Sequence, residues 1–319
     1  MLTRTLAKVS RREAPFKRQF SDKILQHWIR PEVATPLHET RFETLSITPS
    51  LADGLANSDP SVLNVRLNCP KKINAFNMQM WEDLETLFER IQETPSIRAV
   101  VVRGEGRGFS SGMELQVFAE IQEVLGKVPC ESKKREGLMK VIRRFQHIIS
   151  APERCRVPVI AAIHGICWGG AVDFITACDL RVCDNAADFS VKEVDLAIVA
   201  DIGTLQRLPV LIGEQRAKEL SYTGRSFHGA EAEHIGLVLK HHVDAAATFE
   251  HAAQLAQTIA SKSPVTVRGV KKAINYRRDH STEDSLHQVE QWNASMLLSE
   301  DLIEAYMSMT AKKPPQFKD

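Results

Sequence analysis

The stretch that decides the fold is VPVIAAIHGICWGGAVDFITACDLRVC, residues 157–183. It opens with an apolar strand pattern (VPVIAAIHG) and continues through a predicted loop with two glycines (ICWGG). A helix pattern (AVDFITACD) and a second strand pattern (LRVC) follow. Strand and helix patterns that alternate in this way predict an α/β fold with mostly parallel pairing.

The same alternation extends toward the N-terminus. Residues 61–67 (SVLNVRL) alternate apolar and polar side chains as a strand does, and Asn77 is expected to cap an amphipathic helix that runs to about residue 92. The β-branched run 99–103 (AVVVR) predicts a buried strand, and the glycine-rich segment GEGRGFSSG (104–112) follows it. A charged helical region is expected over residues 132–150.

From about residue 245 the pattern is almost entirely helical. Prolines at positions 31, 36 and 49 and the Asp53-Gly54 turn indicate a linker before the first strand. We therefore predict four parts: a transit peptide (1–30), a linker (31–58), an α/β core (59–260) and a C-terminal helical region (261–319).

Composition excludes several classes of protein. The chain has 319 residues, of which 43% are hydrophobic and 25% charged, so it is not disordered, collagenous or coiled-coil. The net charge of +1 gives no signal for nucleic acid or a membrane surface. Apolar runs fall short of the roughly 20 residues that a membrane-spanning helix needs, so a soluble protein without a membrane span is expected.

The neutral total hides a basic N-terminal segment. Residues 1–30 carry a net charge of +6, which leaves −5 for the rest of the chain. A basic, hydroxyl-rich and acid-poor segment of this kind predicts a mitochondrial transit peptide, with a disordered basic tail as the alternative. The C-terminal residues QFKD lack a peroxisomal S-K-L ending, so we expect a mitochondrial (matrix) rather than a peroxisomal location.

Six cysteines are scattered through apolar or mixed stretches. They form no C-x-x-C pair and have no histidine at zinc-finger spacing, so we expect core thiols in a reducing compartment and no metal site.

Two glycine-bearing segments are candidates for a binding site. GFSSG (108–112) formally matches the nucleophile elbow G-x-S-x-G, but that motif needs its serine directly between a strand and a helix, and flexible glycines intervene here. The segment is also neither a dinucleotide-binding fingerprint nor a phosphate-binding P-loop. Gly169 and Gly170 precede a helix, whose N-terminal N–H groups can stabilise negative charge. One backbone donor from each segment would form an oxyanion hole.

Three carboxylates lie in otherwise apolar surroundings. Asp173 falls one turn into the AVDFITACD helix, and Glu193 and Asp201 bracket a stretch rich in apolar residues. Each could serve in catalysis, although a carboxylate taken singly is more often a cap, an ion-pair partner or a solvated residue. Asp179 is expected to pair or cap.

Other residues near these motifs are expected to be structural. His164 is predicted to have a structural role. Lys271 and Lys272 predict a solvated helix face, with contacts to phosphates as the alternative.

The motifs FSSGMEL, IHGICWGGAVDFITACDLR and FSVKEVDLAIVADIGTLQRLP occur together in this order. The chain thereby resembles the crotonase (enoyl-CoA hydratase/isomerase) superfamily, and most closely its Δ3,5-Δ2,4-dienoyl-CoA isomerases. The resemblance runs from about residue 62 through WNASML (292–297) and so covers nearly everything after the linker. It implies a spiral of ββα turns whose C-terminal helical region packs trimers, commonly paired into hexamers. It also implies an acyl-CoA substrate and no cofactor, because CoA is part of the substrate.

The resemblance further assigns site residues. The oxyanion hole would be the backbone N–H groups of Met113 and Gly170, and Asp173, Glu193 and Asp201 stand where this branch has its three acidic residues. Hydratases of the family have Glu at the first of these acidic positions and Gly at the third, which argues against hydration. The residues implied to contact substrate or CoA are Ser111, Gly112, Met113, Glu114, Leu115 and Gly170.

Three carboxylates suit a 1,5 proton shift, in which 3,5-dienoyl-CoA becomes 2,4-dienoyl-CoA during β-oxidation of unsaturated fatty acids. We assign Glu193 to C2, Asp201 to C6 and Asp173 to holding the proton network or the substrate. The alternatives are an enoyl-CoA hydratase or a Δ3-Δ2-enoyl-CoA isomerase of the same fold. A non-catalytic RNA-binding or scaffold homologue is a further alternative, which the acidic body of the chain disfavours.

Overall fold

The computed structural model describes Leu37 and residues 40–48 and 59–318. The chain divides into two compact units, Met1–Thr40 and Arg41–Asp319, and all the described strands and α-helices belong to the second. The predicted transit peptide (1–30) lies outside the described residues, as does most of the predicted linker (31–58).

A six-stranded sheet forms the backbone of the second unit. Its order is β1-β2-β3-β5-β7-β10, and only β1 is antiparallel to its neighbour. The parallel strands follow the apolar runs predicted from the sequence, since the residues of β3 and β5 are all buried. The linker prediction is wrong at four residues, because the alternating segment LSIT forms β1 and pairs with β2. The strands are β1 (Leu45–Thr48), β2 (Val62–Leu67), β3 (Ala99–Gly104), β5 (Val159–Ile163), β7 (Leu180–Asp184) and β10 (His241–His242).

A second sheet of short strands lies beside the first. It has the order β4-β6-β8-β9, namely β4 (Gly108–Ser110), β6 (Ile166–Trp168), β8 (Asp188–Ser190) and β9 (Phe227–His228). The pairs β3–β4, β5–β6 and β7–β8 each place one strand in either sheet, which confirms the predicted spiral of ββα turns. The predicted loop ICWGG is wrong at Ile166–Trp168, which form β6.

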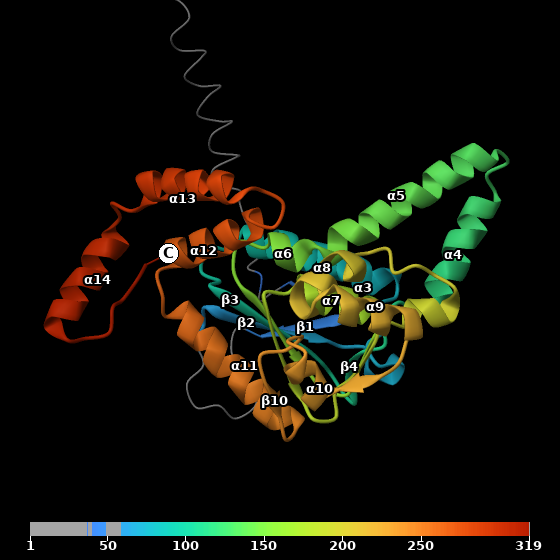
Figure 1. Ribbon diagram of the computed structural model, residues 1–319, viewed down its shortest axis with the longest axis horizontal. Coiled ribbons are helices and arrows are strands. Elements are labelled where there is room, and N and C mark those ends of the chain that lie inside the picture. The colour runs from blue at the N-terminus through green and yellow to red at the C-terminus, as the bar shows by residue number, and fades with distance from the viewer. Residues whose placement is uncertain (1–36, 38–39, 49–58, 319) are drawn as a thin grey trace, which may run out of the picture. The chain divides into compact units, whose positions relative to one another are not determined.

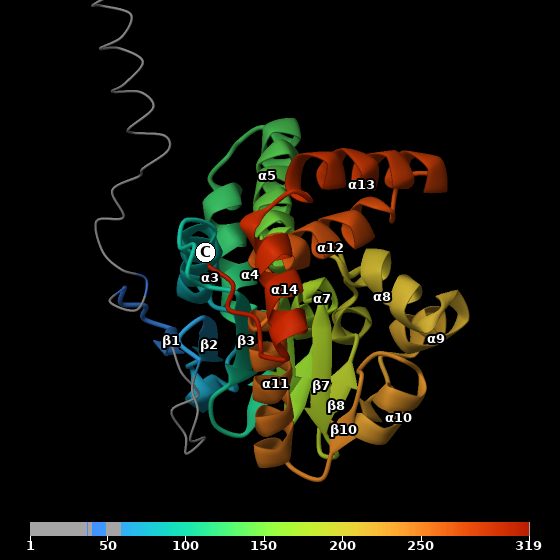
Figure 2. The same cartoon turned by 90° about the vertical axis from the view of Figure 1, so that its left-hand side faces the viewer.

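Helices surround both sheets (Figures 1 and 2). The predicted cap is present, because the Asn77 side chain accepts a hydrogen bond from the Met80 N–H at 2.8 Å. Twelve α-helices and two 3-10 turns are described: η2 (Pro70–Lys72), α3 (Met78–Gln92), α4 (Leu115–Gly126), α5 (Glu131–Ile149), α6 (Ala151–Arg154), α7 (Gly170–Ala177), η3 (Lys192–Leu196), α8 (Thr204–Ile212), α9 (Glu214–Thr223), α10 (Gly229–His234), α11 (Ala245–Ala260), α12 (Pro264–Tyr276), α13 (Thr282–Met296) and α14 (Glu300–Ala311).

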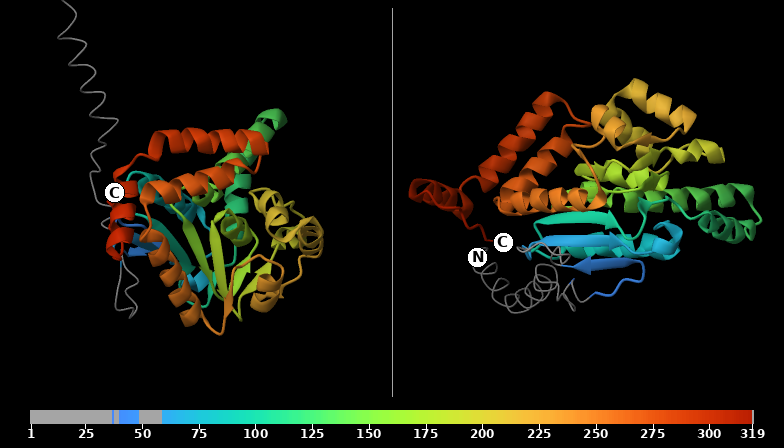
Figure 3. Two further views of the ribbon diagram at one scale, coloured as in Figure 1. Left: turned by 60° about the vertical axis from the view of Figure 1, so that its left-hand side comes forward. Right: turned by 90° about the horizontal axis from the view of Figure 1, so that it is seen from below.

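Two helices are packed against the sheets. Every residue of α7 is buried, so the helix that carries Asp173 belongs to the core. Helix α11 covers the large sheet with Ala252, Ala256 and Ala260, which contact apolar side chains of β2, β3, β5 and β7. Helices α4 and α5 form a hairpin that projects from the core, and α12–α14 follow α11 on the other side (Figures 1 and 3). No helix in the described part of the chain is long and apolar enough to cross a membrane.

Candidate active site

Two backbone turns, far apart in the sequence, meet at Gly112 and Gly170. Gly112 has φ +83°, a conformation that side chains disfavour. A Cβ atom at this position would lie 2.5 Å from the Trp168 carbonyl oxygen and 3.0 Å from the Gly170 nitrogen. Glycine is therefore needed here both for its conformation and for the close approach of the two backbones.

The meeting of these turns brings together the two predicted oxyanion donors. Phe76 donates its N–H to Gly112 O (2.7 Å) and accepts from Glu114 N–H (3.1 Å), which leaves the intervening Met113 N–H free of this ladder. A Cβ on Gly170 would lie 3.4 Å from the Met113 nitrogen. Neither the Met113 N–H nor the Gly170 N–H finds an acceptor among the described residues. Gly170 is the first residue of α7, so the helix dipole adds positive potential at this point.

Asp173 lies on α7 one turn beyond these donors and is fully buried. Its Oδ1 atom accepts a hydrogen bond of 2.5 Å from the backbone N–H of Thr204. Its Oδ2 atom is buried without a partner in the described structure. Burial raises the pKa of Asp173 to about 6, against the hydrogen bonds from Thr204, which lower it.

Glu193 lies in η3, next to the turn that precedes α7. Its Oε1 atom would be 3.4 Å from a Cβ on Gly169. Its Oε2 atom is buried with no partner among the described residues. Burial, followed by the negative charge of Asp173, raises the pKa of Glu193 to about 8. Two neighbouring buried carboxyl groups resist double ionisation, so the pair retains one proton near neutral pH.

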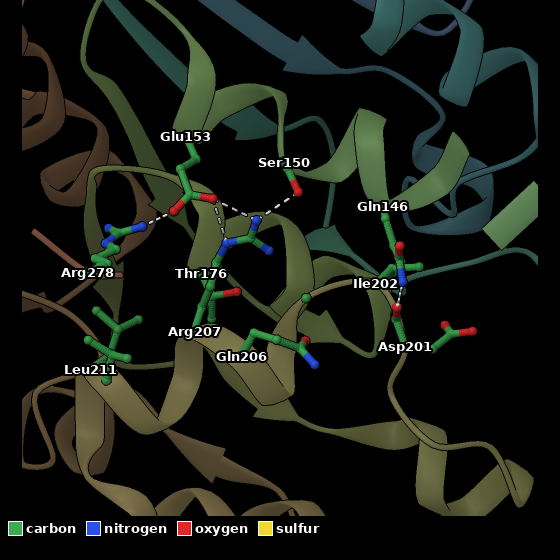
Figure 4. Close-up of a pocket in the computed structure, with 12 residues that line it drawn as sticks. Gln146, Ser150, Glu153, Thr176, Asp201, Ile202, Gln206, Arg207, Leu211 and Arg278 are labelled. Atoms are coloured by element: carbon green, nitrogen blue, oxygen red, sulfur yellow. Dashed lines mark hydrogen bonds and ion pairs between the residues drawn. The ribbon is translucent and has the colours of Figure 1, made fainter. Parts of the chain in front are cut away.

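Asp201 occupies the loop between η3 and α8 and is exposed. Its charge acts on both other acids, raising the pKa of Asp173 and of Glu193. Burial of part of its own side chain raises the pKa of Asp201. The residue lines a cavity of about 490 Å³, shown in Figure 4. Its backbone carbonyl accepts a hydrogen bond of 2.6 Å from Gln146 of α5.

The predicted CoA-contacting segment runs from the second sheet to the first turn of α4. Ser111 donates its hydroxyl to the Lys72 carbonyl at 3.2 Å, and Glu114 forms an ion pair with the Lys72 ammonium group. Leu115 is the first residue of α4 and is 63% exposed. Gly112 and Met113 lie at the oxyanion donors, while the polar groups of Ser111 and Glu114 are held by η2.

Sequence reasoning missed three residues of this region. Thr204 supplies the hydrogen bond to Asp173, Gln146 holds the backbone at Asp201, and Arg207 lines the cavity. One signal was available: Gly203 immediately precedes a helix, and a helix N-terminus can hold a carboxylate through its unpaired N–H groups.

The residues expected to be structural have structural contacts. His164 is buried, and its Nε2 atom lies 2.9 Å from Gly106 O. Asp179 pairs with Lys271 at 2.7 Å, but Lys271 is buried, so the prediction of a solvated face is wrong for this lysine. No group of three or more His, Cys, Asp or Glu side chains within the described ranges could hold a metal ion.

Comparison with known proteins gives one consistent family. Residues 57–319 match the enoyl-CoA hydratase/isomerase family. The chain is 40% identical over 261 residues to a peroxisomal Δ(3,5)-Δ(2,4)-dienoyl-CoA isomerase of Arabidopsis thaliana, covering 82% of this chain and 94% of that protein. It is 42% identical over 275 residues to the mitochondrial isomerase of the same name from Rattus norvegicus, covering 85% and 81%.

A solved structure supports the same assignment. The enoyl-CoA hydratase of Bacillus anthracis superposes with a TM-score of 0.75 at 30% identity, covering 86% of this chain and 99% of that one.

Proposed function

Because the chain belongs to the enoyl-CoA hydratase/isomerase family, we propose that it converts 3,5-dienoyl-CoA to 2,4-dienoyl-CoA in the β-oxidation of unsaturated fatty acids. It is an isomerase that transposes carbon–carbon double bonds. The observation that carries this function is the set of three electrostatically coupled acids, Asp173, Glu193 and Asp201, beside two free backbone donors. The names of relatives that are 40% and 42% identical support it.

The reaction begins with loss of a proton from C2 of the substrate. The thioester carbonyl and the adjacent diene acidify this proton, and its removal gives a dienolate whose charge reaches the thioester oxygen. In our proposal the Met113 and Gly170 N–H groups donate to that oxygen, and the loss of one such donor typically costs ~3 kcal/mol. The thioester itself accepts the electrons, so we propose that no cofactor takes part.

Glu193 is proposed as the base at C2. Its carboxyl lies beside the turn that carries Gly170 N–H, and C2 is bonded to the carbonyl carbon. Burial raises the pKa of Glu193 to about 8, and a general base works best when its pKa is near the pH of the reaction. Glu193 can therefore accept the C2 proton and later release it.

Asp201 is proposed as the acid that protonates C6 of the dienolate. The proton that Glu193 took from C2 later returns to the Asp201 carboxylate, so that no net proton is gained or lost in a turnover. C2 and C6 are four bonds apart, beyond the reach of one carboxyl held in contact with both, so a second group is required. Asp201 lines the 490 Å³ cavity, whereas Asp173 and Glu193 do not, so the Asp201 carboxyl is separate from the enclosed pair.

Asp173 is proposed to hold the shared proton rather than to meet the substrate. The Thr204 N–H fixes one of its oxygens, and the other faces the Glu193 carboxyl without a partner among described groups. When the shared proton lies on Asp173, the Glu193 carboxylate is ionised and can remove the C2 proton.

We further propose that the protein self-associates into trimers, and trimers into hexamers, through the C-terminal helices. Exposed apolar side chains on these helices support this, and an aqueous surface disfavours them in such number. They include Leu286 on α13, Ile303, Tyr306 and Met307 on α14, and Leu297 and Leu298 in the link between these helices. No nucleic-acid partner is proposed.

The two relatives named above are organellar proteins, one mitochondrial and one peroxisomal. We propose the mitochondrial matrix for this chain, on the basic composition of residues 1–30.

The deciding experiment offers purified protein 3,5-dienoyl-CoA and follows the absorbance of the conjugated 2,4-dienoyl product. A parallel assay with a 2-enoyl-CoA measures hydration, the activity in the name of the similar Bacillus anthracis enzyme. Asp201→Asn is expected to lower isomerisation by about 10²–10⁴-fold, the contribution of one positioned acid or base. Because Asp201 is exposed, the variant should keep its fold. Hydration without isomerisation in the wild type would contradict the proposal.

A further inference from the structure

Arg207 lies on α8, and its guanidinium group is largely enclosed, with 14% of the side chain exposed. Its Nε and Nη2 atoms donate to Glu153 Oε2 at 3.1 and 2.7 Å, and Nη2 also donates to Ser150 Oγ at 2.7 Å. Glu153 makes a second ion pair with Arg278, which follows α12. Figure 4 shows the Glu153 carboxylate between the two guanidinium groups. The Arg207 fork is therefore fixed in one orientation.

The fixed guanidinium group fills the space next to Gly203. Gly203 has φ +142°, and a Cβ atom there would overlap with Arg207 Nη1. The Gly203 carbonyl also accepts backbone N–H bonds from Gln206 and Arg207, each at 3.2 Å. Arg207 thus contacts Gly203 in two ways: its guanidinium group packs against the glycine, and its backbone N–H donates to the Gly203 carbonyl.

Gly203 lies in the turn that serves the site acids. Asp201 is two residues before it, and Thr204, whose N–H holds Asp173 Oδ1, is the next residue. Gln146 holds the carbonyl of Asp201 from α5. A movement of Gly203 would therefore displace both the Asp173 hydrogen bond and the Asp201 carboxyl.

We propose that Arg207 is a positioning residue for the isomerisation. By packing its anchored guanidinium group against Gly203, it keeps the turn 201–204, and with it Asp201, in a fixed position relative to Asp173 and Glu193. This inference rests on the proposed function. It assigns Arg207 no contact with the reacting atoms, because its Nε and Nη2 donors are directed at Glu153 and Ser150 and its Nη1 atom lies against Gly203.

The charges around Arg207 give the proposal a second readout. Asp173 stabilises the guanidinium cation, so the cation in turn favours the ionised form of Asp173. Asp173 and Glu193 titrate as a coupled pair, so removal of the cation would raise the pKa at which the pair loses its first proton and move the acidic limb of kcat/KM to higher pH. The charged or titratable groups that face Arg207 are Glu153, Arg278, Arg154, Asp173 and Cys178.

The test compares Arg207→Met, Arg207→Lys and the matched control Arg225→Met. Arg225 also makes two-atom contacts with carboxylates, Glu219 and Glu231, but its side chain is 40% exposed and these contacts do not involve the turn 201–204. In Arg207→Met, Glu153 keeps its pairing with Arg278, so the fold is expected to survive.

We expect Arg207→Met to lower kcat by about 10²-fold, the usual cost of misplacing a site by about 1 Å, with KM little changed. The acidic limb of its kcat/KM profile should move to higher pH, and the Thr204 amide should exchange with deuterium faster than in wild type. Arg207→Lys should recover part of kcat and restore the acidic limb, because it retains the charge without the fork. Arg225→Met should match wild type in all three measurements.

The proposal is overturned if Arg207→Met keeps wild-type kcat and pH profile, or if Arg225→Met loses activity equally. It is also overturned if a fall in the folded fraction explains the whole loss while the pH profile and the Thr204 exchange rate stay unchanged. If the wild type fails to isomerise 3,5-dienoyl-CoA, the proposed function fails. Thr204 exchange still tests the hold of Arg207 on the turn in that case, because it needs no substrate.

Discussion

Replacement of Gly112 by alanine should separate catalysis from stability. The new Cβ would lie 2.5 Å from the Trp168 carbonyl oxygen and 3.0 Å from the Gly170 nitrogen. An ordinary contact needs 3.4 Å or more, so the two turns must separate by roughly 1 Å, and a displacement of that size can cost about 10²-fold in rate. The Met113 and Gly170 amides would then no longer meet one oxyanion, a loss of ~3 kcal/mol if one donor fails. A positive φ of 83° adds about 1–3 kcal/mol of backbone strain to the folded state.

Gly213→Ala is the matched control. Gly213 has nearly the same φ, +85°, but an added Cβ would meet nothing within 4 Å. In urea unfolding, Gly213→Ala should lose only the stability that its positive φ costs, whereas Gly112→Ala should lose about 1–3 kcal/mol more, because the two packed turns are also forced apart. Only Gly112→Ala should lose isomerase activity, by about 10²-fold or more in kcat. Equal activity of Gly112→Ala and wild type, or an equal loss in Gly213→Ala, would refute the argument that the close approach of the two turns builds the oxyanion hole.

Two further predictions concern buried charges. Glu193 has a folded pKa raised to about 8 from an ordinary value of 4.5, so the folded state binds the extra proton and stability falls as pH rises from about 4.5 to about 8. Glu193→Gln should remove that part of the pH dependence in urea unfolding and be more stable than wild type at pH 8, with kcat lowered by about 10²–10⁴-fold; an unchanged pH dependence would show that Glu193 ionises normally. Lys271→Met should destabilise the protein by about 1–3 kcal/mol, because it leaves the half-buried Asp179 carboxylate without its cation, whereas Lys272→Met should have little effect; similar stability of the two variants would contradict the Lys271–Asp179 pair.

The long elements of the fold could be predicted from local patterns. The helix that Asn77 caps ends at Gln92 as expected, and the buried strand at 99–103 differs from β3 only by Gly104. These elements bury one face or both faces along many residues, so the periodicity of apolar side chains reports them directly.

The short strands escaped prediction for a physical reason. Strands β4, β6 and β8 have three residues each, too few for a period of two to appear, and their pairing partners lie far away in the chain. Helix α4 was missed although LQVFAEIQEVLG spaces apolar residues as a helix does, and only Val117 of them is buried in the structure. Lys271 was misjudged because a local sequence of two lysines does not reveal Asp179 on a distant element.

The candidate site could be predicted in part. The sequence contains the glycines and the acids, and the family resemblance assigns them, but neither reveals that an added atom on Gly112 would meet Gly170. That contact depends on β4 and β6 pairing in the second sheet. The same holds for Thr204, whose role arises from the position of its amide and not from the chemistry of its side chain.

The protonation state of Asp173 and Glu193 is related to the free-energy cost of burying their carboxyl oxygens. Asp173 Oδ2 and Glu193 Oε2 are both buried without a partner among the described residues, and unsatisfied buried oxygens destabilise a folded protein. A shared proton offsets part of this cost, because only one of the two carboxyl groups then carries a charge. The same desolvation raises the pKa of Glu193 to about 8, which makes the group a stronger base than an exposed glutamate. An Asp173–Glu193 pair that accepted further hydrogen bonds would be more stable and a weaker base, because such donors favour the ionised carboxylate.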